Sequence, residues 1–365
     1  MNDDKNTIEK ILSLARWAPS GDNNQYWRFD PIDGLTVRVH GFDSRSHCVY
    51  DLDGHPSHIS LGALLETIEI AASAESMAVD MQLDPSSVDT HPIYNLTFRR
   101  DPGMQPNPLA AVIEKRCVQR RPFTTRPLRE DERQRLREAV GGRHELHLIE
   151  GFSQRLRTAK LMFHSAKLRL TIKEAYQVHA KIIEWDTRFS KDRIPDAALG
   201  ASKMTLMMMR PAMKSWSRVQ FLNRFLAGTW APRIELDFLP GILCAAHFVV
   251  CAKEPPTTMQ HYIEGGRALQ SFWLTVTLLG LNLQPEVTPL VFTRYARQRR
   301  NFAPSAPDAL RRADRVAERL GDLVGQRVSD CAVFMGRIGE GPAPTARSLR
   351  LDFKDLAHDP ANEPH

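Results

Sequence analysis

The first hundred residues alternate between helical and strand-like patterns of apolar positions. Residues 7–17 place apolar side chains at positions 8, 11, 12 and 15, the spacing of one helix face, and Pro19 follows as a stop signal. Residues 60–74 carry a second apolar stripe at helical spacing. Alternating apolar and polar side chains at 35–39 and 94–98 predict two strands.

A Pro-rich stretch at 101–108 marks the best boundary in the chain, and a longer second part follows it. Residues 130–140 predict a charged helix, and residues 152–230 predict successive helices rich in Met. The remaining predicted elements are strands over 145–149, 241–250 and 331–338 and a buried helix over 265–279.

Two stretches far apart in the chain run parallel to each other. Gly62 opens the run Gly-Ala-Leu-Leu-Glu, and Gly266 opens the run Gly-Arg-Ala-Leu-Gln. Each run begins a helical stretch that leads into an apolar strand. The match is weak as text, but it places one helix–strand unit in each part and suggests an ancient duplication.

The composition is that of an ordinary globular protein. The 365 residues are 42% hydrophobic and 25% charged, which excludes disordered, collagen-like and disulfide-scaffold classes. The apolar stretches fall short of the ~20 residues of a membrane span. The opening residues are polar and acidic, and the five cysteines form no C-x-x-C pair. We therefore expect a cytoplasmic protein with no membrane partner.

The formal charge of +6 is small and comes mostly from Arg. Its densest run, residues 294–300, is typical of a solvated helix face, so we expect no nucleic-acid partner. The excess still permits a local cluster of Arg that holds one anionic ligand.

Three stretches carry candidate chemistry. Residues 15–29 contain a polar turn in which Ser20, Asn23 and Gln25 can hydrogen-bond a planar polar ligand, although an ordinary helix-to-strand turn has the same composition. Arg116 and Arg120 would share one face of a helix and suit a phosphate, although a lone pair with this spacing is more often a solvated basic run.

The third stretch, residues 265–286, is a buried amphipathic helix that enters a short strand ending near Pro285 and Glu286. A purely structural interpretation is sufficient for it. A basic C-terminal segment adds Arg347 and Arg350, and its signal alone is very weak.

Together these stretches resemble motifs of the nitroreductase-like flavoproteins, which bind FMN. Residues 18–27 resemble the family's Ala-Pro-Ser-x-x-Asn-x-Gln-Pro-Trp signature, with Tyr26 in place of Pro. Residues 116–123 resemble its Arg-Arg-Ser-x-Arg-x-Phe phosphate motif, with Val118 in place of Ser. Residues 280–285 resemble its Gly-Leu-Gly-x-x-x-x-Pro stretch.

The resemblance implies an α+β nitroreductase-like fold, mainly antiparallel sheets flanked by helices. Because the first part holds the Ser20 loop and the second holds the Arg motif, we expect two half-domains fused as a pseudo-dimer, as in the Acg-like branch. The expected boundaries are 1–105 for the first half, 106–340 for the second with a helical lid insertion over about 152–240, and 341–365 for a tail. We expect a monomer or a weak homodimer.

The resemblance also implies the site. Ser20 and Asn23 would fix the flavin ring edge, Gln25 would also belong to the cofactor site, Pro285 and Glu286 would touch the ring mainly through main chain, and the four Arg would hold the phosphate. The expected function is an FMN-dependent NAD(P)H oxidoreductase that passes two electrons to a nitroarene or quinone. The alternative is a binding protein that sequesters FMN without turnover, and a less favoured one is a flavin-fragmenting enzyme.

Other chemistries are poorly represented. The sequence lacks His-Glu-x-x-His, a Walker A loop and a Gly-x-Gly-x-x-Gly helix start. Its 13 histidines are scattered without ligand spacing, which predicts no metal site, and His247 is expected to be a satisfied core residue. The Met207–Met209 run is expected to pack between helices. No side chain is required as a catalytic acid or base.

Overall fold

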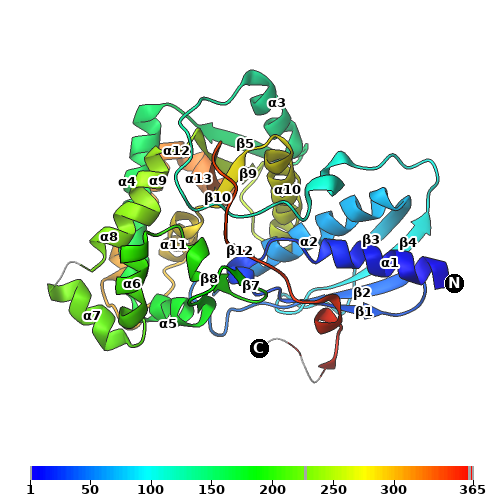
Figure 1. The fold of residues 1–365 in the computed structure, drawn as a ribbon, viewed down its shortest axis with the longest axis horizontal. Helices are drawn as coiled ribbons and strands as arrows, with labels where there is room; N and C mark the ends of the chain where they lie inside the picture. Colours follow the sequence, from blue (N-terminus) through cyan, green and yellow to red (C-terminus); the bar gives the residue numbers. More distant parts are fainter. Residues whose placement is uncertain (1, 226–227, 361–362, 364–365) are drawn as a thin grey trace.

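The computed structural model describes residues 2–225, 228–360 and 363, and it contains two four-stranded antiparallel sheets flanked by helices (Figure 1). The α+β prediction is therefore confirmed. The first sheet comprises β1 (Trp27–Pro31), β2 (Thr36–Gly41), β3 (Met77–Leu83) and β4 (Ile93–Arg100). The second comprises β5 (His144–Ile149), β9 (Ala246–Ala252), β10 (Asn282–Pro285) and β11 (Ala332–Gly339).

The two sheets have the same connectivity. The first has the order β1-β2-β4-β3, and the second, read from its first strand, has the order β5-β9-β11-β10. In both, a 20-residue helix joins the second strand to the third: α2 (His55–Ala74) and α10 (Met259–Leu278). We call the parts that carry these sheets the first half and the second half. Each half thus repeats one arrangement of four strands and a central helix.

The central helices pack against each other in a reciprocal way. A Cβ on Gly62 would lie 1.9 Å from the carbonyl oxygen of Ile263, and a Cβ on Gly266 would lie 2.1 Å from that of Ile59. Both helices therefore need glycine at the crossing. Each isoleucine precedes the glycine of its own helix by three residues, so the contact has the self-complementary form of a two-fold interface.

Polar contacts follow the same rule. Glu66 accepts a hydrogen bond from the hydroxyl of Ser271 at 2.6 Å, and Gln270 donates one to the hydroxyl of Thr67 at 2.9 Å. Glu66 and Gln270 hold equivalent places in the two parallel runs of sequence. The similarity between the Gly62 run and the Gly266 run in the sequence thus corresponds to equivalent positions in the packing of the two helices.

Long insertions distinguish the second half. Between β5 and β9 lie α4 (Phe152–Leu170), α5 (Lys173–Ile182), α6 (Lys203–Ala212), α7 (Trp216–Phe225), α8 (Trp230–Arg233) and α9 (Leu239–Ile242). The outer helices are α1 (Asn2–Ala15), α3 (Glu130–Ala139), α11 (Thr288–Arg297), α12 (Ala309–Val324) and α13 (Gln326–Cys331). None of the described helices combines the length and hydropathy that crossing a membrane requires.

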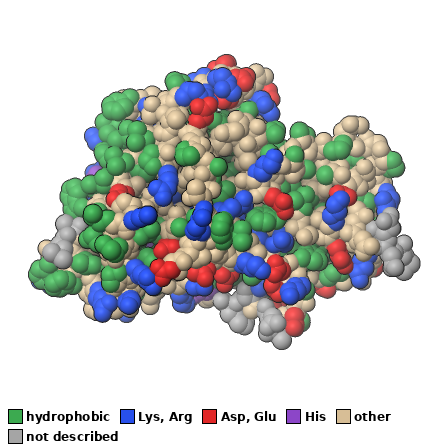
Figure 2. All heavy atoms as spheres, viewed as in Figure 1, with side chains coloured by type: hydrophobic (Ala, Val, Ile, Leu, Met, Phe, Trp, Pro, Cys, Tyr) green, Lys and Arg blue, Asp and Glu red, His purple; other side chains and the backbone are tan. Residues whose placement is uncertain are grey.

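Three details differ from the sequence-based expectations. Residues 183–199 interrupt the predicted run of helices with three two-residue strands: β6 (Ile183–Glu184), β7 (Phe189–Ser190) and β8 (Ile194–Pro195). The predicted strand over 241–250 begins only at Ala246, because α9 occupies 239–242. Met207 is 71% exposed and Met208 60% exposed, so the Met run does not pack inside; Figure 2 shows apolar side chains gathered at this end of the molecule.

The C-terminal segment returns across the molecule to the first half. Its β12 (Arg347–Ser348) pairs in parallel with β7. Further on, Phe353 packs against Phe29 of β1, and Leu356 is fully buried in the hydrophobic core of the first half. The rest of the predicted tail includes residues 361–362 and 364–365, which lie outside the described residues.

Candidate functional site

A pocket lies between the two halves. The first half contributes residues 19–23 and the start of α2, and the second contributes residues 116–120, β10 and α11. The insertion adds Ile194 and Ala198, and the C-terminal segment adds residues 347–350. The two halves, the insertion and the C-terminal segment therefore enclose one cavity together.

The loop before β1 is held in an unusual backbone shape. Asp22, Asn23 and Gln25 have φ values of +52°, +65° and +50°, in the left-handed region that non-glycine residues adopt rarely. The Ser20 hydroxyl accepts a hydrogen bond from the Gln25 backbone N–H at 3.1 Å and closes the turn. Ser20 and Asn23 both line the pocket.

Asn23 joins three parts of the chain. Its amide nitrogen donates to the carbonyl oxygens of Lys191 at 3.1 Å and Arg193 at 3.3 Å, and its amide oxygen accepts from Arg350 at 2.8 Å. The loop is thereby tied to the insertion and to the C-terminal segment.

Gln25 does not line the pocket, in contrast to its predicted contact with the ring edge. Its side chain is fully buried, and its amide nitrogen donates to the carbonyls of Asn23 and Lys191. Its amide oxygen accepts from the Leu351 backbone N–H at 2.8 Å. Both the amide nitrogen and the amide oxygen of Gln25 thus hydrogen-bond to backbone groups and hold the loop against neighbouring chain segments.

The segment with Arg116 and Arg120 is extended rather than helical. The Gln119 backbone N–H donates to the Leu283 carbonyl at 3.1 Å, which pairs the segment with β10. In extended chain, alternate side chains point to the same side, so a spacing of four still places both arginines together. Arg116, Val118 and Arg120 all line the pocket.

Arg116, Arg347 and Arg350 form a cationic cluster at the pocket wall. Arg116 is 3% exposed and donates to the Trp17 carbonyl; Arg350 is 6% exposed and donates to the Ala18 carbonyl. Arg347 donates to the Arg116 carbonyl at 3.2 Å. We call these three residues the Arg cluster.

The Arg cluster has no acidic partner in the part of the chain that the structure describes. Their hydrogen bonds go to carbonyl oxygens and to the amide oxygen of Asn23, and none of the three guanidinium groups forms an ion pair there. Burial, and then the nearby charges of Arg116 and Arg347, lower the pKa of Arg350 well below its usual range. Burial lowers the pKa of Arg116 to about 10. Since an unpaired buried charge is costly, the cluster calls for an anionic ligand.

Asp22 and Arg120 form a second polar group in the pocket. Arg120 donates to the Ala198 carbonyl at 3.0 Å. Burial raises the pKa of Asp22 to about 6, against the opposing charge of Arg120. The sequence analysis missed Asp22, because the motif it resembles leaves that position unspecified.

Several buried polar atoms of the pocket residues have no hydrogen-bond partner. They are Nε of Arg116, Nε of Arg347, Nε1 of Trp273 and Oε1 of Gln284. Buried polar atoms in folded proteins are nearly always bonded. Three free donors and one free acceptor therefore suit a ligand that offers both acceptor and donor groups.

The rest of the wall is apolar and includes an aromatic ring. The Arg116 guanidinium lies over the Trp273 ring, 4.7 Å from its centroid. Trp273 had no place in the sequence analysis beyond its position on a buried helix face. The main apolar lining residues are Ile59, Ala63, Leu269, Val291 and Phe334.

Pro285 lines the pocket as expected, but Glu286 does not. The Glu286 backbone N–H donates to the Met335 carbonyl at 2.8 Å, as part of the sheet. Its carboxylate lies 2.7 Å from Nδ1 of His247, which is fully buried. Burial would lower the pKa of His247, but the Glu286 charge raises it well above the usual value. Glu286 is therefore not among the lining residues, and its expected main-chain contact with the ligand stays a prediction, whereas the expectation of a satisfied His247 is confirmed.

The equivalent position on the other side of the central helices is lined by charged side chains. Ala63 and Trp273 line the pocket, and their counterparts in the parallel runs are Arg267 and Glu69. Arg267 forms ion pairs with Glu66 and Glu69, and it also contacts the sulfur of Met81 at 3.4 Å. The long charged side chain thus occupies the place where the pocket has a methyl group.

No protein-family model matches the chain, and no curated protein matches it either. Among solved structures, a nitroreductase with bound FMN from Bacteroides fragilis NCTC 9343 is similar over 65% of this chain and 89% of its own, with 10% identity and a TM-score of 0.34. A nitroreductase-like family protein from Bacillus cereus is similar over 69% of this chain and 96% of its own, with 14% identity and a TM-score of 0.34.

Proposed function

We propose that this chain binds one FMN in the pocket between its halves. The observation that carries the proposal is the Arg cluster at the wall of a largely apolar pocket, in which Arg116 and Arg350 are buried, Arg347 is half-buried, and none of the three has an acidic partner among the described residues. FMN combines a doubly charged phosphate with a flat, mostly apolar ring that carries hydrogen-bonding edges. The pocket offers a matching set of features.

The residues present fit such a group. Arg116, Arg347 and Arg350 would hold the phosphate through charge-assisted hydrogen bonds, for which two Nε atoms remain unbonded. Trp273 and Gln284 would contact the ring system, and Ser20 and Pro285 would border it. Arg120 lies beside Asp22 rather than among the three arginines, so we assign it to another part of the ligand than the phosphate.

The proposal includes a fused pseudo-dimer with one site. It is supported by the shared strand order, by the reciprocal contacts of the central helices and by the two-sided origin of the pocket lining. At the equivalent position Arg267 is already ion-paired with Glu66 and Glu69, so it is not an unpaired cation that calls for a phosphate, which favours a single FMN per chain.

For the activity, we infer an FMN-dependent oxidoreductase that takes electrons from NAD(P)H and passes them to a small acceptor such as a nitroarene or quinone. The flavin, when bound, supplies the hydride and electron chemistry. This chain's residues would neutralise the phosphate, orient the ring and exclude water.

One observation favours the alternative of a sequestering protein without turnover. The insertion reaches the pocket through Ile194 and Ala198, and the carbonyls of Lys191 and Arg193 are fastened to Asn23. A cover bonded to both the loop and the C-terminal segment would restrict access of a second substrate to the ring.

Anaerobic titration with NADH and with NADPH separates the two activities. Loss of the flavin's yellow absorbance on adding either nucleotide, and its return on adding a quinone, is expected for the oxidoreductase. Persistent absorbance with both nucleotides would refute turnover and leave the sequestering role. A flavin-fragmenting enzyme would release a product other than FMN on denaturation.

A further inference from the structure

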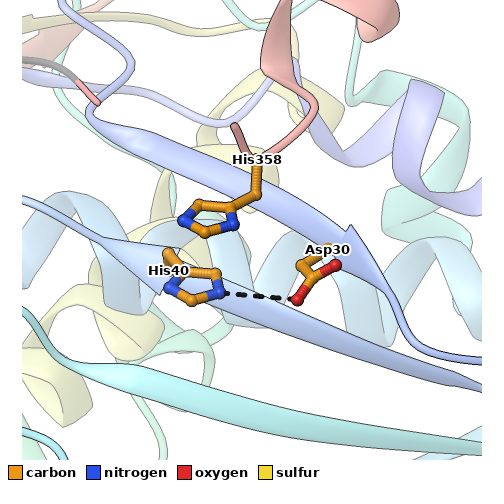
Figure 3. Close-up of side chains that lie close together, drawn as sticks. All are labelled: Asp30, His40 and His358. Atoms are coloured by element: carbon orange, nitrogen blue, oxygen red, sulfur yellow. Dashed lines mark ion pairs between the residues drawn. The ribbon is translucent and has the colours of Figure 1, made fainter. Parts of the chain in front are cut away.

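Two histidines and an aspartate meet at the edge of the first sheet, away from the pocket. Asp30 lies on β1, His40 on β2, and His358 follows the C-terminal segment onto the same sheet (Figure 3). One potential ligand atom from each lies within 4.8 Å of the other two. The fold therefore joins residues from the two ends of the chain.

His40 presents a buried nitrogen with no hydrogen bond. The side chain is buried, with the residue 5% exposed, and its Nε2 has no hydrogen-bond partner among the described residues; Oδ2 of Asp30 is 3.9 Å away. Its other nitrogen, Nδ1, lies 3.1 Å from Nε2 of His91. With the shared proton on Nδ1, the lone pair of His40 Nε2 faces Asp30.

His358 is held in place from two sides. Its backbone N–H donates to the Phe29 carbonyl at 2.8 Å, and its Nε2 lies 3.4 Å from the carboxylate of Glu363. Nδ1 is the nitrogen left for another ligand. Figure 3 shows the rings of His358 and His40 lying over each other. Their centroids are 3.9 Å apart and their planes differ by 3°.

We propose that Asp30, His40 and His358 bind one divalent transition-metal ion of the Zn²⁺ type. Two imidazole nitrogens and one carboxylate suit zinc, whereas Mg²⁺ and Ca²⁺ prefer oxygen ligands. Bond lengths of about 2.0–2.2 Å place the ligands of a tetrahedral zinc roughly 3.3 Å apart. A small side-chain rotation closes the 3.9 Å between His40 Nε2 and the Asp30 carboxylate to that spacing. Ligation by both imidazoles also requires the His358 ring to turn out of its parallel stack on His40, because an imidazole nitrogen lone pair lies in the plane of its ring. Water would complete the coordination.

His91 acts as a positioning residue in this site. By accepting a hydrogen bond from His40 Nδ1, His91 would fix the tautomer and the ring orientation of the metal ligand, as outer hydrogen-bond partners do in zinc sites. Phe42, which stacks on His91 with centroids 4.6 Å apart, holds that ring in turn.

The ion would fasten the C-terminal segment to the first half. His358 lies eight residues beyond Arg350, and the intervening chain is fixed through Leu351 and Phe353. The same segment carries Arg347 and Arg350 to the pocket. The effect on the pocket rests on the proposed function, but metal binding itself does not.

The test uses the full chain without an affinity tag, freed of metal by chelation and titrated calorimetrically with Zn²⁺. We expect one Zn²⁺ per chain, and no comparable binding of Mg²⁺. His358→Gln and Asp30→Asn should each weaken binding at least about tenfold, and His91→Ala about 10- to 100-fold. His147→Gln, which removes a histidine from β5, is the matched control and should bind as the unchanged chain does.

The proposal is overturned if the unchanged chain binds no Zn²⁺, or if His358→Gln and Asp30→Asn both bind it as well as the control does. Backbone hydrogen exchange gives a second reading. Zn²⁺ should slow exchange of the His358 amide, which donates to Phe29, and leave the amides of β9 unchanged. Because neither measurement involves flavin, failure of FMN binding would leave this result interpretable.

Discussion

The two halves share one architecture, but the two equivalent positions beside the central helices are lined differently: the pocket between the halves is largely apolar, whereas the hollow on the other side is lined by charged side chains such as Glu66 and Arg267. On one side Ala63 and Trp273 border the cavity; on the other, Arg267 and Glu69 hold the same places and pair with each other. The Gly62 and Gly266 crossing is equally tight in both directions. The comparison indicates that the same packing of the central helices is compatible with two different linings, one apolar beside the Arg cluster and one made of ion-paired side chains.

The largest effect should come from breaking the symmetric crossing. Gly62→Ala and Gly266→Ala each place a Cβ about 2 Å from a backbone oxygen that cannot rotate away. Each should destabilise the protein by about 3 kcal/mol or more, above the usual cost of overpacking. Denaturant unfolding measures this, with Gly142→Ala, which meets open space, as the control. Unequal effects of the two substitutions would contradict the reciprocal packing.

The Arg cluster should show opposite effects on ligand binding and on stability. Arg347→Met removes a charge-assisted contact worth about 1.5–3 kcal/mol, so FMN should bind roughly 10- to 100-fold more weakly. Stability of the FMN-free protein should stay the same or rise, because one of three clustered charges is lost. Fluorescence titration and denaturant unfolding measure the two, and Arg121→Met, at an exposed neighbour of Arg120, is the control. Unchanged affinity would remove Arg347 from the site.

Asp22 should give the FMN-free protein a pH-dependent stability. Its pKa of about 6 in the folded protein exceeds the unfolded value near 4, so the folded state binds more protons between these values. Stability should therefore fall as pH rises from about 4 to 6. Asp22→Asn removes this loss, and its melting temperature should rise relative to that of the unchanged chain across the same interval.

Asp33→Asn provides a control of opposite sign for Asp22. Backbone hydrogen bonds from Leu35 and Thr36 lower the pKa of Asp33, so its carboxylate adds stability that is present at neutral pH and lost in acid. The melting temperature of the Asp33→Asn variant should fall below that of the unchanged chain as pH rises. Parallel pH profiles for the two variants would contradict the assignment of Asp22.

The smallest effect should come from the ion-paired Arg267, at the position equivalent to Ala63. Arg267→Met breaks a partly exposed ion-pair group, so it should cost no more than about 1 kcal/mol. The number of FMN molecules bound per chain should stay at one. A second bound FMN in this variant, detected by flavin quantification, would show that the ion pair alone closes the second position.

Because burial of one face imposes regular spacing, sequence periodicity predicted most strands of both sheets, but not β1. The equivalence of Gly62 and Gly266 was predicted from the two parallel runs of sequence. Periodicity did not predict which distant segments contact each other. Gln25 and Glu286 bear side chains suited to a ligand, but Leu351 and His247 bind them instead. Nothing local distinguishes an amide that faces a ligand from one that fastens a loop.

The Arg segment shows how a wrong local structure can still give the right placement. A helix and an extended chain both place Arg116 and Arg120 on one side, so the error did not affect their position in the pocket. Trp273 was predicted only as a buried helix residue, since its pocket exposure depends on the approach of the first half. The His40 and His358 pair was missed because more than three hundred residues separate them.

The flavin content of the purified chain tests the central claim most directly. The chain should be incubated with excess FMN, separated from free flavin and measured by absorbance before and after denaturation. We predict a yellow protein that releases one FMN per 365-residue chain. A colourless protein that retains no flavin after this treatment would contradict the account.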